Sequence, residues 1–358
     1  MSYRLPFIPA AVVVLIATTH ATQSARVLDK PQVEIAEPFT NVGSVRELSD
    51  GRVILVDVGN QSVHVVDFTA KSVEPIGRTG SGPGEYKSPQ LLLPLGGDTT
   101  LLVDPGNVRL LEIGPNAKPT RAISDAWPLV DARPGTRLPR DIDARGRGYQ
   151  PGRAVNARPQ TGVVQPDSSA LVRFARGSVT EDTIGYFHLS PRKIDIAQSN
   201  GAIRSVSIIV PPFPSQDGWV AFPDGAVALV RTHDYRVDWV LADGKRVAGR
   251  VIPYTPVKVT DADKKKRASD GPAPEWPDVK PPFAYSGVLA GADGNVWIPR
   301  YASADDTRSH YDVIDRRGVI VARVDVPNRG KVVGFGAKSI YVVRVDDDDL
   351  QYLQRFPL

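Results

Sequence analysis

The chain of 358 residues contains no cysteine, and it has only one methionine and five histidines. The absence of cysteine excludes disulfides, thiol catalysis and thiolate metal sites, so the core must be stabilised by apolar burial alone. The sequence also lacks a His-x-x-x-His spacing, a Gly-x-Ser-x-Gly elbow and the Gly-Lys-Ser/Thr ending of a phosphate-binding loop. It therefore predicts neither a metal nor a cofactor.

Charge of one sign is also scarce. The 44 Lys and Arg residues nearly balance the 40 Asp and Glu residues, and the net charge of +4 is spread over the whole chain. Nucleic-acid-binding surfaces carry a clear excess of basic residues, so we expect no nucleic-acid partner. We also expect the protein to be a monomer. The one basic run, residues 264–267, lies in a Pro-rich segment over 254–284. We interpret it as a solvated loop or one-turn helix rather than a patch for an anionic partner.

Long hydrophobic runs are limited to the N-terminus. Residues 5–17 form an apolar stretch of 13 residues after Arg4, which is too short to span a bilayer and is typical of a signal peptide. The sequence predicts a signal peptide over 1–21, with cleavage possible as late as 25, and a single mature domain over 22–358. We expect export to the periplasm or the exterior, with no membrane span in the mature chain. The alternative is a buried N-terminal strand.

The rest of the chain repeats one theme of short β-branched runs bounded by Gly, Asp and Asn turns. A run that ends at Asp57 returns as a run that ends at Asp104, 47 residues later, which is about the length of one four-stranded propeller blade. Counting such units predicts six blades. Their clearest strands lie within residues 51–67, 98–112, 140–174, 218–244, 285–327 and 332–355, and 254–284 is an inserted loop between blades four and five.

The sixth unit stops after three strands, which would leave an unpaired edge. Residues 31–36 precede the first blade and are strand-like, so we expect them to pair with the strand from Gln351 to Phe356. The fold class predicted from the sequence is therefore all-β, a six-bladed β-propeller closed by an N-terminal strand that pairs into the last blade.

Several motifs resemble the NHL-like and TolB-like six-bladed propellers of exported bacterial proteins. They are Gly-Pro-Gly-Glu-Tyr at 82–86, the Val-Asp endings at Asp57 and Asp104, and Tyr-Arg-Val-Asp-Trp at 235–239 with Asp-Gly at 243–244. The resemblance covers nearly the whole mature chain and implies the fold. It implies little about function, because such propellers serve as enzymes, receptors and scaffolds.

The best candidate site follows from aligning the ends of the second strands, which open one rim of the central channel. Those positions hold Asp57, Asp104, Arg231, Arg300 and Arg344. Three guanidinium groups at one rim would suit bidentate binding of a carboxylate, sulfate or phosphate. The alternative is that each arginine forms a salt bridge or a hydrogen bond with a neighbouring blade.

Other features predict structure rather than chemistry. We expect the glycines at 77, 80, 82 and 84 to serve a tight crossing between blades, and His64 to pack within a strand. His233 and His310 are placed on the rim. The favoured function is an exported binding protein that recognises a small anionic ligand, a glycan or a protein partner. The alternative is a propeller lyase or hydrolase that uses rim carboxylates and histidines, with or without a metal.

Overall fold

The computed structural model describes residues 25–123, 138–152, 167–191, 193–199, 202–267 and 274–358. The signal segment that the sequence predicts, residues 1–21, lies outside them. In the described part of the chain no helix combines the length and the apolar character that crossing a membrane requires.

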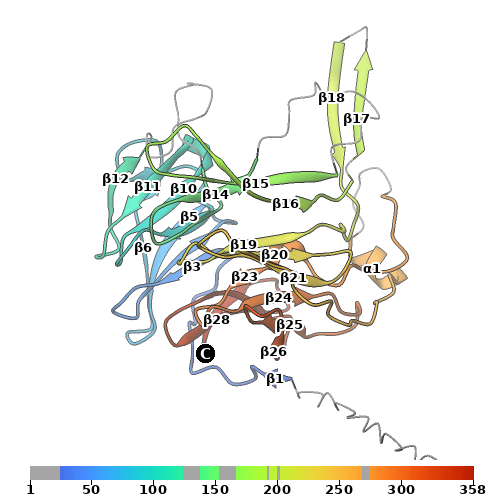
Figure 1. The fold of residues 1–358 in the computed structure, drawn as a ribbon. Helices are drawn as coiled ribbons and strands as arrows, with labels where there is room; N and C mark the ends of the chain where they lie inside the picture. Colours follow the sequence, from blue (N-terminus) through green and yellow to red (C-terminus); the bar gives the residue numbers. More distant parts are fainter. Residues whose placement is uncertain (1–24, 124–137, 153–166, 192, 200–201, 268–273) are drawn as a thin grey trace, which may run out of the picture.

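The prediction of an all-β, six-bladed propeller is confirmed (Figure 1). Each of the first four blades is an antiparallel sheet of four consecutive strands. Blade one consists of β3 (Val42–Glu47), β4 (Val53–Asp57), β5 (Ser62–Asp67) and β6 (Ser72–Pro75), and blade two of β9 (Leu91–Pro94), β10 (Thr100–Asp104), β11 (Arg109–Ile113) and β12 (Pro119–Ile123). Blade three consists of β13 (Asp141–Ile142), β14 (Gly148–Pro151), β15 (Ser168–Phe174) and β16 (Asp182–His188), and blade four of β19 (Gly218–Ala221), β20 (Val227–Arg231), β21 (Arg236–Val240) and β22 (Arg246–Val247).

Blades five and six each recruit a strand from the N-terminal segment. Blade five consists of β23 (Leu289–Ala290), β24 (Val296–Arg300), β25 (Ser309–Ile314) and β26 (Ile320–Val326), with β1 (Arg26–Val27) parallel to β26. Blade six consists of β27 (Lys331–Phe335), β28 (Ser339–Val345) and β29 (Gln351–Pro357), with β2 (Val33–Glu34) antiparallel to β29. In that register Val33 lies opposite Arg355 and Glu34 opposite Gln354. The sequence analysis does not foresee the pairing of β1.

Apolar side chains fill the space between neighbouring blades. The first strands of successive blades contact one another around the centre, for example β27 with β3 and β3 with β9. Six buried clusters follow the ring, each shared by two adjacent blades. The cluster between blades six and one contains Leu55 and Tyr341, so the last blade packs on the first. Because both faces of each sheet are covered in this way, the second strands are buried along almost their whole length, as β4 and β10 are.

Smaller elements lie outside the six blade sheets. The glycine-rich crossing between blades one and two contains a short parallel pair, β7 (Arg78–Thr79) and β8 (Glu85–Tyr86). Gly77 there has a φ of +65°, and a Cβ at this position would lie 2.7 Å from the carbonyl oxygen of Gly84. Only glycine fits such a turn, so its role in this crossing is structural.

One element was missed by the sequence analysis. Between blades three and four, β17 (Lys193–Ser199) and β18 (Ala202–Ile209) form an antiparallel hairpin that belongs to none of the six blade sheets. The hairpin projects away from the blades (Figure 1).

The inserted segment between blades four and five is built onto the ring. Its helix α1 (Asp261–Lys266) begins at Thr260, which forms a capping box with Asp263. A β-bridge joins Lys258 to Val279. The prediction of a one-turn helix near the basic run is therefore confirmed.

Removing residues 22–38 tests the contribution of the N-terminal strands. The deletion takes away β1, β2 and the buried side chains of Leu28 and Ile35. Because full burial of one such side chain stabilises a fold by about 1.5–3 kcal/mol, we expect the free energy of unfolding to fall by at least about 3 kcal/mol. Thermal unfolding measures the change, with Val27→Ala as a control because that side chain is 47% exposed. An unchanged melting temperature would show that β2 does not close the ring.

Candidate functional site

The five residues aligned by the sequence analysis occupy the positions expected of them. Asp57, Asp104, Arg231 and Arg300 are the last residues of the second strands of their blades. Arg344 is the last but one residue of the second strand of blade six. Their contacts differ, however, and divide them into three groups.

The two carboxylates hold loops between blades. Asp57 is 1% exposed and accepts the backbone N–H groups of Thr40 and Asn41, both at 2.9 Å. Asp104 is fully buried and accepts the N–H of Ser88 at 2.8 Å. Burial alone would raise the pKa of Asp57, but its N–H donors bring that pKa below the usual value. Since these oxygens are engaged by the chain itself, both carboxylates stabilise the entry into a first strand.

Arg231 and Arg344 are held by carboxylates of the protein. The Arg231 guanidinium lies 2.8 Å from Asp238 and 3.0 Å from Asp217. Arg344 makes a two-pronged pair with Glu34 of β2, with distances of 2.9 and 3.0 Å. No ion pair joins either arginine to Asp57 or Asp104 in the described residues. Both arginines are thus paired internally, but their acidic partners lie in or directly beside their own blades, and the contact of Arg231 with a neighbouring blade is a hydrogen bond to the carbonyl of Tyr186.

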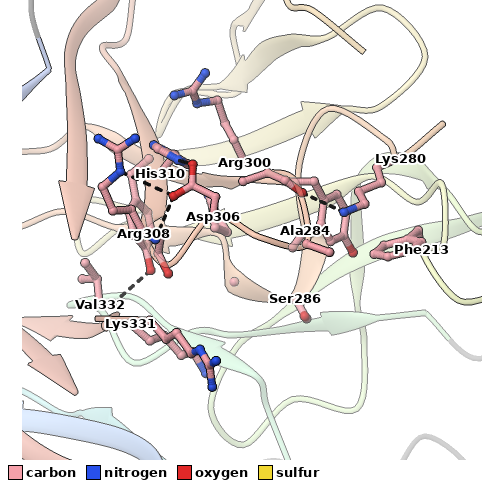
Figure 2. Close-up of a pocket in the computed structure, with 18 of the residues that line it drawn as sticks. Phe213, Lys280, Ala284, Ser286, Arg300, Asp306, Arg308, His310, Lys331 and Val332 are labelled. Atoms are coloured by element: carbon pink, nitrogen blue, oxygen red, sulfur yellow. Dashed lines mark hydrogen bonds and ion pairs between the residues drawn. The ribbon is translucent and has the colours of Figure 1, made fainter. Parts of the chain in front are cut away.

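Arg300 differs from the two other arginines in that it lines a large cavity of the described structure. A pocket of about 580 Å³ lies at the mouth of the central channel. Its walls are the β24–β25 connection of blade five, the start of β27, Gly43 of blade one and the insertion with α1. We call it the channel-mouth pocket. Figure 2 shows Lys280 and Phe213 on the side opposite Asp306, Arg308 and His310.

The lining of the channel-mouth pocket is strongly cationic. Seven basic side chains face two carboxylates, Asp263 and Asp306. The basic residues are Lys266, Arg267, Lys280, Arg300, Arg308, Arg329 and Lys331. Charges of one sign gathered in a concave wall raise the local concentration of ions of the opposite sign, so this pocket attracts anions.

A buried ion pair fixes the insertion against the pocket. The Lys280 ammonium lies 2.6 Å from Asp263, and both side chains are less than a tenth exposed. Lys280 also donates to the carbonyl of Ala302 at 2.7 Å and lies 5.0 Å from the centre of the Phe213 ring. Burial alone would raise the pKa of Asp263, but the hydrogen bonds from Lys280 and Thr260 bring it below the usual value. Lys280 therefore shapes the wall and is largely neutralised.

In the opposite wall, His310 links two carboxylates. Its Nδ1 lies 2.6 Å from Asp325 and its Nε2 lies 2.9 Å from Asp306, so both ring nitrogens are occupied by carboxylates. Hydrogen bonds from His310 and from the backbone N–H of Arg308 lower the pKa of Asp306 to about 2. An imidazole held on both sides is a positioning group and has no free nitrogen for a substrate.

Three cations at the mouth have no acidic partner among the described residues. The Arg267 guanidinium lies over the Phe213 ring, 4.3 Å from its centre. The side chains of Arg329 and Lys331 are exposed and make no ion pair in the part of the chain that the structure describes. These groups are available to an incoming anion.

All four residues of the basic run at 264–267 are exposed, as the sequence predicts. Lys266 nevertheless donates to the carbonyl of Ala304 and lines the pocket together with Arg267. The reason is that α1 packs on the rim instead of extending into solvent. Among the remaining candidates, His64 lies within β5 against Ser62, and the ring of His233 lies 4.6 Å from that of His188.

Comparison with known proteins adds a description of the fold and no more. No family model and no curated protein matches the chain. Regucalcin, a calcium-binding protein from Agrobacterium tumefaciens, is 12% identical, with 92% of this chain and 95% of that chain covered and a TM-score of 0.40. A gluconolactonase from Xanthomonas campestris is 8% identical, with 94% and 98% covered and a TM-score of 0.43. A protein from Bacteroides fragilis described as exported is 15% identical, with 94% and 95% covered and a TM-score of 0.46.

At these identities and TM-scores the likeness does not extend to a shared activity. The class that the structure defines is the six-bladed β-propeller. The narrower NHL-like or TolB-like membership stays a prediction from the sequence motifs.

Replacing Asp306 with Asn tests the carboxylate–imidazole contact through its pH dependence. An unfolded aspartate titrates near pH 3.9, whereas Asp306 titrates near 2 in the fold. Its stabilisation is therefore complete above about pH 4 and is lost as the pH falls toward 2. Urea unfolding of the wild type should lose up to about 1 kcal/mol more than Asp306→Asn over this interval, since solvent screening at this partly exposed carboxyl reduces the effect of the pKa shift. Parallel curves for the two proteins would contradict the contact.

Proposed function

We propose that this protein is a binding propeller that holds a small, multiply charged anion in the channel-mouth pocket. The observation that carries the proposal is that three basic side chains at one cavity, Arg267, Arg329 and Lys331, have no acidic partner among the described residues. Both carboxylates are engaged, Asp263 with Lys280 and Asp306 with His310, which leaves a surplus of positive charge. A neutral glycan would leave that surplus unbalanced.

The pocket has the size and the rigidity that small ligands require. A volume of about 580 Å³ lies within the usual range of roughly 300–1,000 Å³ for small-molecule sites. The Lys280–Asp263 pair and the His310 bridges fix two of its walls before a ligand arrives. Preorganisation of this kind lowers the entropy lost on binding. Arg267, Arg329 and Lys331 are exposed at the mouth and supply the unpaired charges that bind the anion.

The enzymatic alternative has less support. Asp57 and Asp104 are occupied by backbone donors, and both nitrogens of His310 by carboxylates. A lyase or hydrolase would need at least one of these groups free to accept a proton from the substrate. Binding without chemistry is therefore favoured.

Citrate is a suitable probe because it carries several carboxylates in a compact shape. At a concentration one hundred times its dissociation constant, we expect it to stabilise the wild type by about 2.7 kcal/mol. The double variant Arg329→Gln/Lys331→Gln should lose most of this shift while it melts normally without citrate, because neither side chain makes an ion pair in the described residues. Thermal unfolding and calorimetric titration measure both effects.

Lys338→Gln is the matched control for the citrate experiment. Lys338 is an exposed lysine of the same blade and does not line the pocket. It should bind citrate as the wild type does. Equal loss in Lys338→Gln and in the double variant would mean that citrate responds to overall charge, and no citrate binding at all would reject the proposal.

We also propose that the protein acts outside the cytoplasm, on the strength of the apolar run over residues 5–17 after Arg4. The expected mature N-terminus lies near Thr22 or Arg26. N-terminal sequencing of protein recovered from the periplasm or the medium tests this. Recovery of a membrane-embedded chain that still begins at Met1 would overturn it.

A further inference from the structure

A second cavity lies next to the channel-mouth pocket on the rim of blade five. It has a volume of about 520 Å³. Both cavities are lined by Arg300, Tyr301, Asp306 and His310, so the β24–β25 connection forms a wall between them. Most of the remaining lining is different, because this cavity contains Asp312 and Arg323 together with Pro253, Pro281 and Pro282. We call it the Asp312 pocket.

The floor of the Asp312 pocket carries two guanidinium groups on one carboxylate. Asp312 of β25 is 2% exposed. Its Oδ1 lies 3.3 Å from Nε of Arg300 on β24 and 3.4 Å from Nε of Arg323 on β26. The hydroxyl of Tyr235, from blade four, donates to the other oxygen at 2.9 Å. One carboxylate therefore has to balance two guanidinium groups, and one of its two oxygens is already engaged by the hydroxyl of Tyr235.

None of these three facing atoms makes a hydrogen bond of good geometry. The buried Nε atoms of Arg300 and Arg323 and the Oδ1 of Asp312 all lack a hydrogen-bond partner in the described structure. No described residue accepts a hydrogen bond from the terminal nitrogens of either guanidinium. Buried polar groups are nearly always satisfied, so these poorly oriented contacts show that Asp312 alone does not fully compensate the two guanidinium groups.

The terminal nitrogens of the two guanidinium groups indicate which kind of ligand the pocket would bind. In Figure 2 the Arg300 side chain extends away from Lys280, Ser286 and Lys331, that is, away from the channel-mouth pocket. Side-by-side guanidinium groups with free terminal nitrogens match the planar fork of a carboxylate. Asp306 adds no unbalanced charge, because His310 and Arg308 already engage it. The surplus is one positive charge, which suits a monocarboxylate.

The opposite wall of the pocket is apolar. Pro253, Pro281 and Pro282 line it together with Tyr254, whose side chain is 41% exposed and meets the ring of Tyr235 edge-on at 6.0 Å. An exposed tyrosine beside prolines favours contact with a flat apolar or aromatic group. We propose that the Asp312 pocket is a second binding site, specific for a monocarboxylate carried on an aromatic or apolar body.

Benzoate tests this site, with uncharged benzamide as the shape control. Calorimetric titration should show one benzoate bound to the wild type and at least about tenfold weaker binding of benzamide, the factor expected for losing one charge-assisted pair. Arg323→Gln should weaken benzoate binding by about tenfold or more on the same basis. Equal affinity for benzamide, or unchanged benzoate binding in Arg323→Gln, would overturn the proposal.

A second variant keeps the test decisive if Arg323→Gln unfolds. Tyr254→Ala removes the apolar wall without touching an ion pair, and its matched control is Tyr186→Ala, a tyrosine that is 62% exposed on blade three. Benzoate should bind several-fold more weakly to Tyr254→Ala and unchanged to Tyr186→Ala. Equal binding to both would count against the site.

The experiments test the two sites independently of each other. Arg323 does not line the channel-mouth pocket, and neither Arg329 nor Lys331 lines the Asp312 pocket. Benzoate should therefore bind to Arg329→Gln/Lys331→Gln as it binds to the wild type, whatever citrate does. If that variant loses benzoate binding while Arg323→Gln retains it, benzoate occupies the channel-mouth pocket and the second site does not exist.

Discussion

Each blade of this protein has two apolar faces, and neither can be left in water. Burying both requires a neighbouring blade on each side, and the ring of six shared clusters meets that requirement. The constraint confines most polar groups to the strand ends and the loops, and a charge within a strand, such as that of Asp312, needs a partner beside it. Buried carboxylates such as Asp57 and Asp104 satisfy the backbone there. Charged side chains are therefore tolerated mainly at the rim. Most of those around the two cavities belong to blade five and its insertion.

The cationic rim depends on how the insertion is held. The Lys280–Asp263 pair is almost completely buried, and such a pair adds more to geometric specificity than to stability. It positions Phe213 and the end of α1, so that Lys266 and Arg267 reach the pocket from one side while Arg329 and Lys331 reach it from blade six. On the outer side of the same wall, Arg300 and Arg323 crowd Asp312. The β24–β25 connection thereby separates two cavities, one with several surplus positive charges and one with a single surplus positive charge.

The fold could be predicted because it rests on local, repeated signals, such as the Val-Asp strand endings and the turns between them. The candidate site could be predicted only in part. Strand-end alignment finds Arg300, but the partner of Arg344 is Glu34 from the far end of the chain, and no local pattern reveals it. Arg231 pairs with Asp238 on the next strand of its own blade, which the motif at 235–239 contains. Arg329, Lys331 and Lys280 meet only in three dimensions. The hairpin β17–β18 did leave a signal, since Asn200-Gly201 between two β-branched runs is typical of a tight hairpin turn.

The most direct test of the cationic rim is a crystal structure of the full mature chain grown with citrate. The charges predict an ordered anion in the channel-mouth pocket, in contact with Arg329 and Lys331 and beside the Lys280–Asp263 pair, which should stay intact. An empty pocket at a saturating citrate concentration, or an ordered citrate on a different face with the pocket vacant, would contradict this view of the protein.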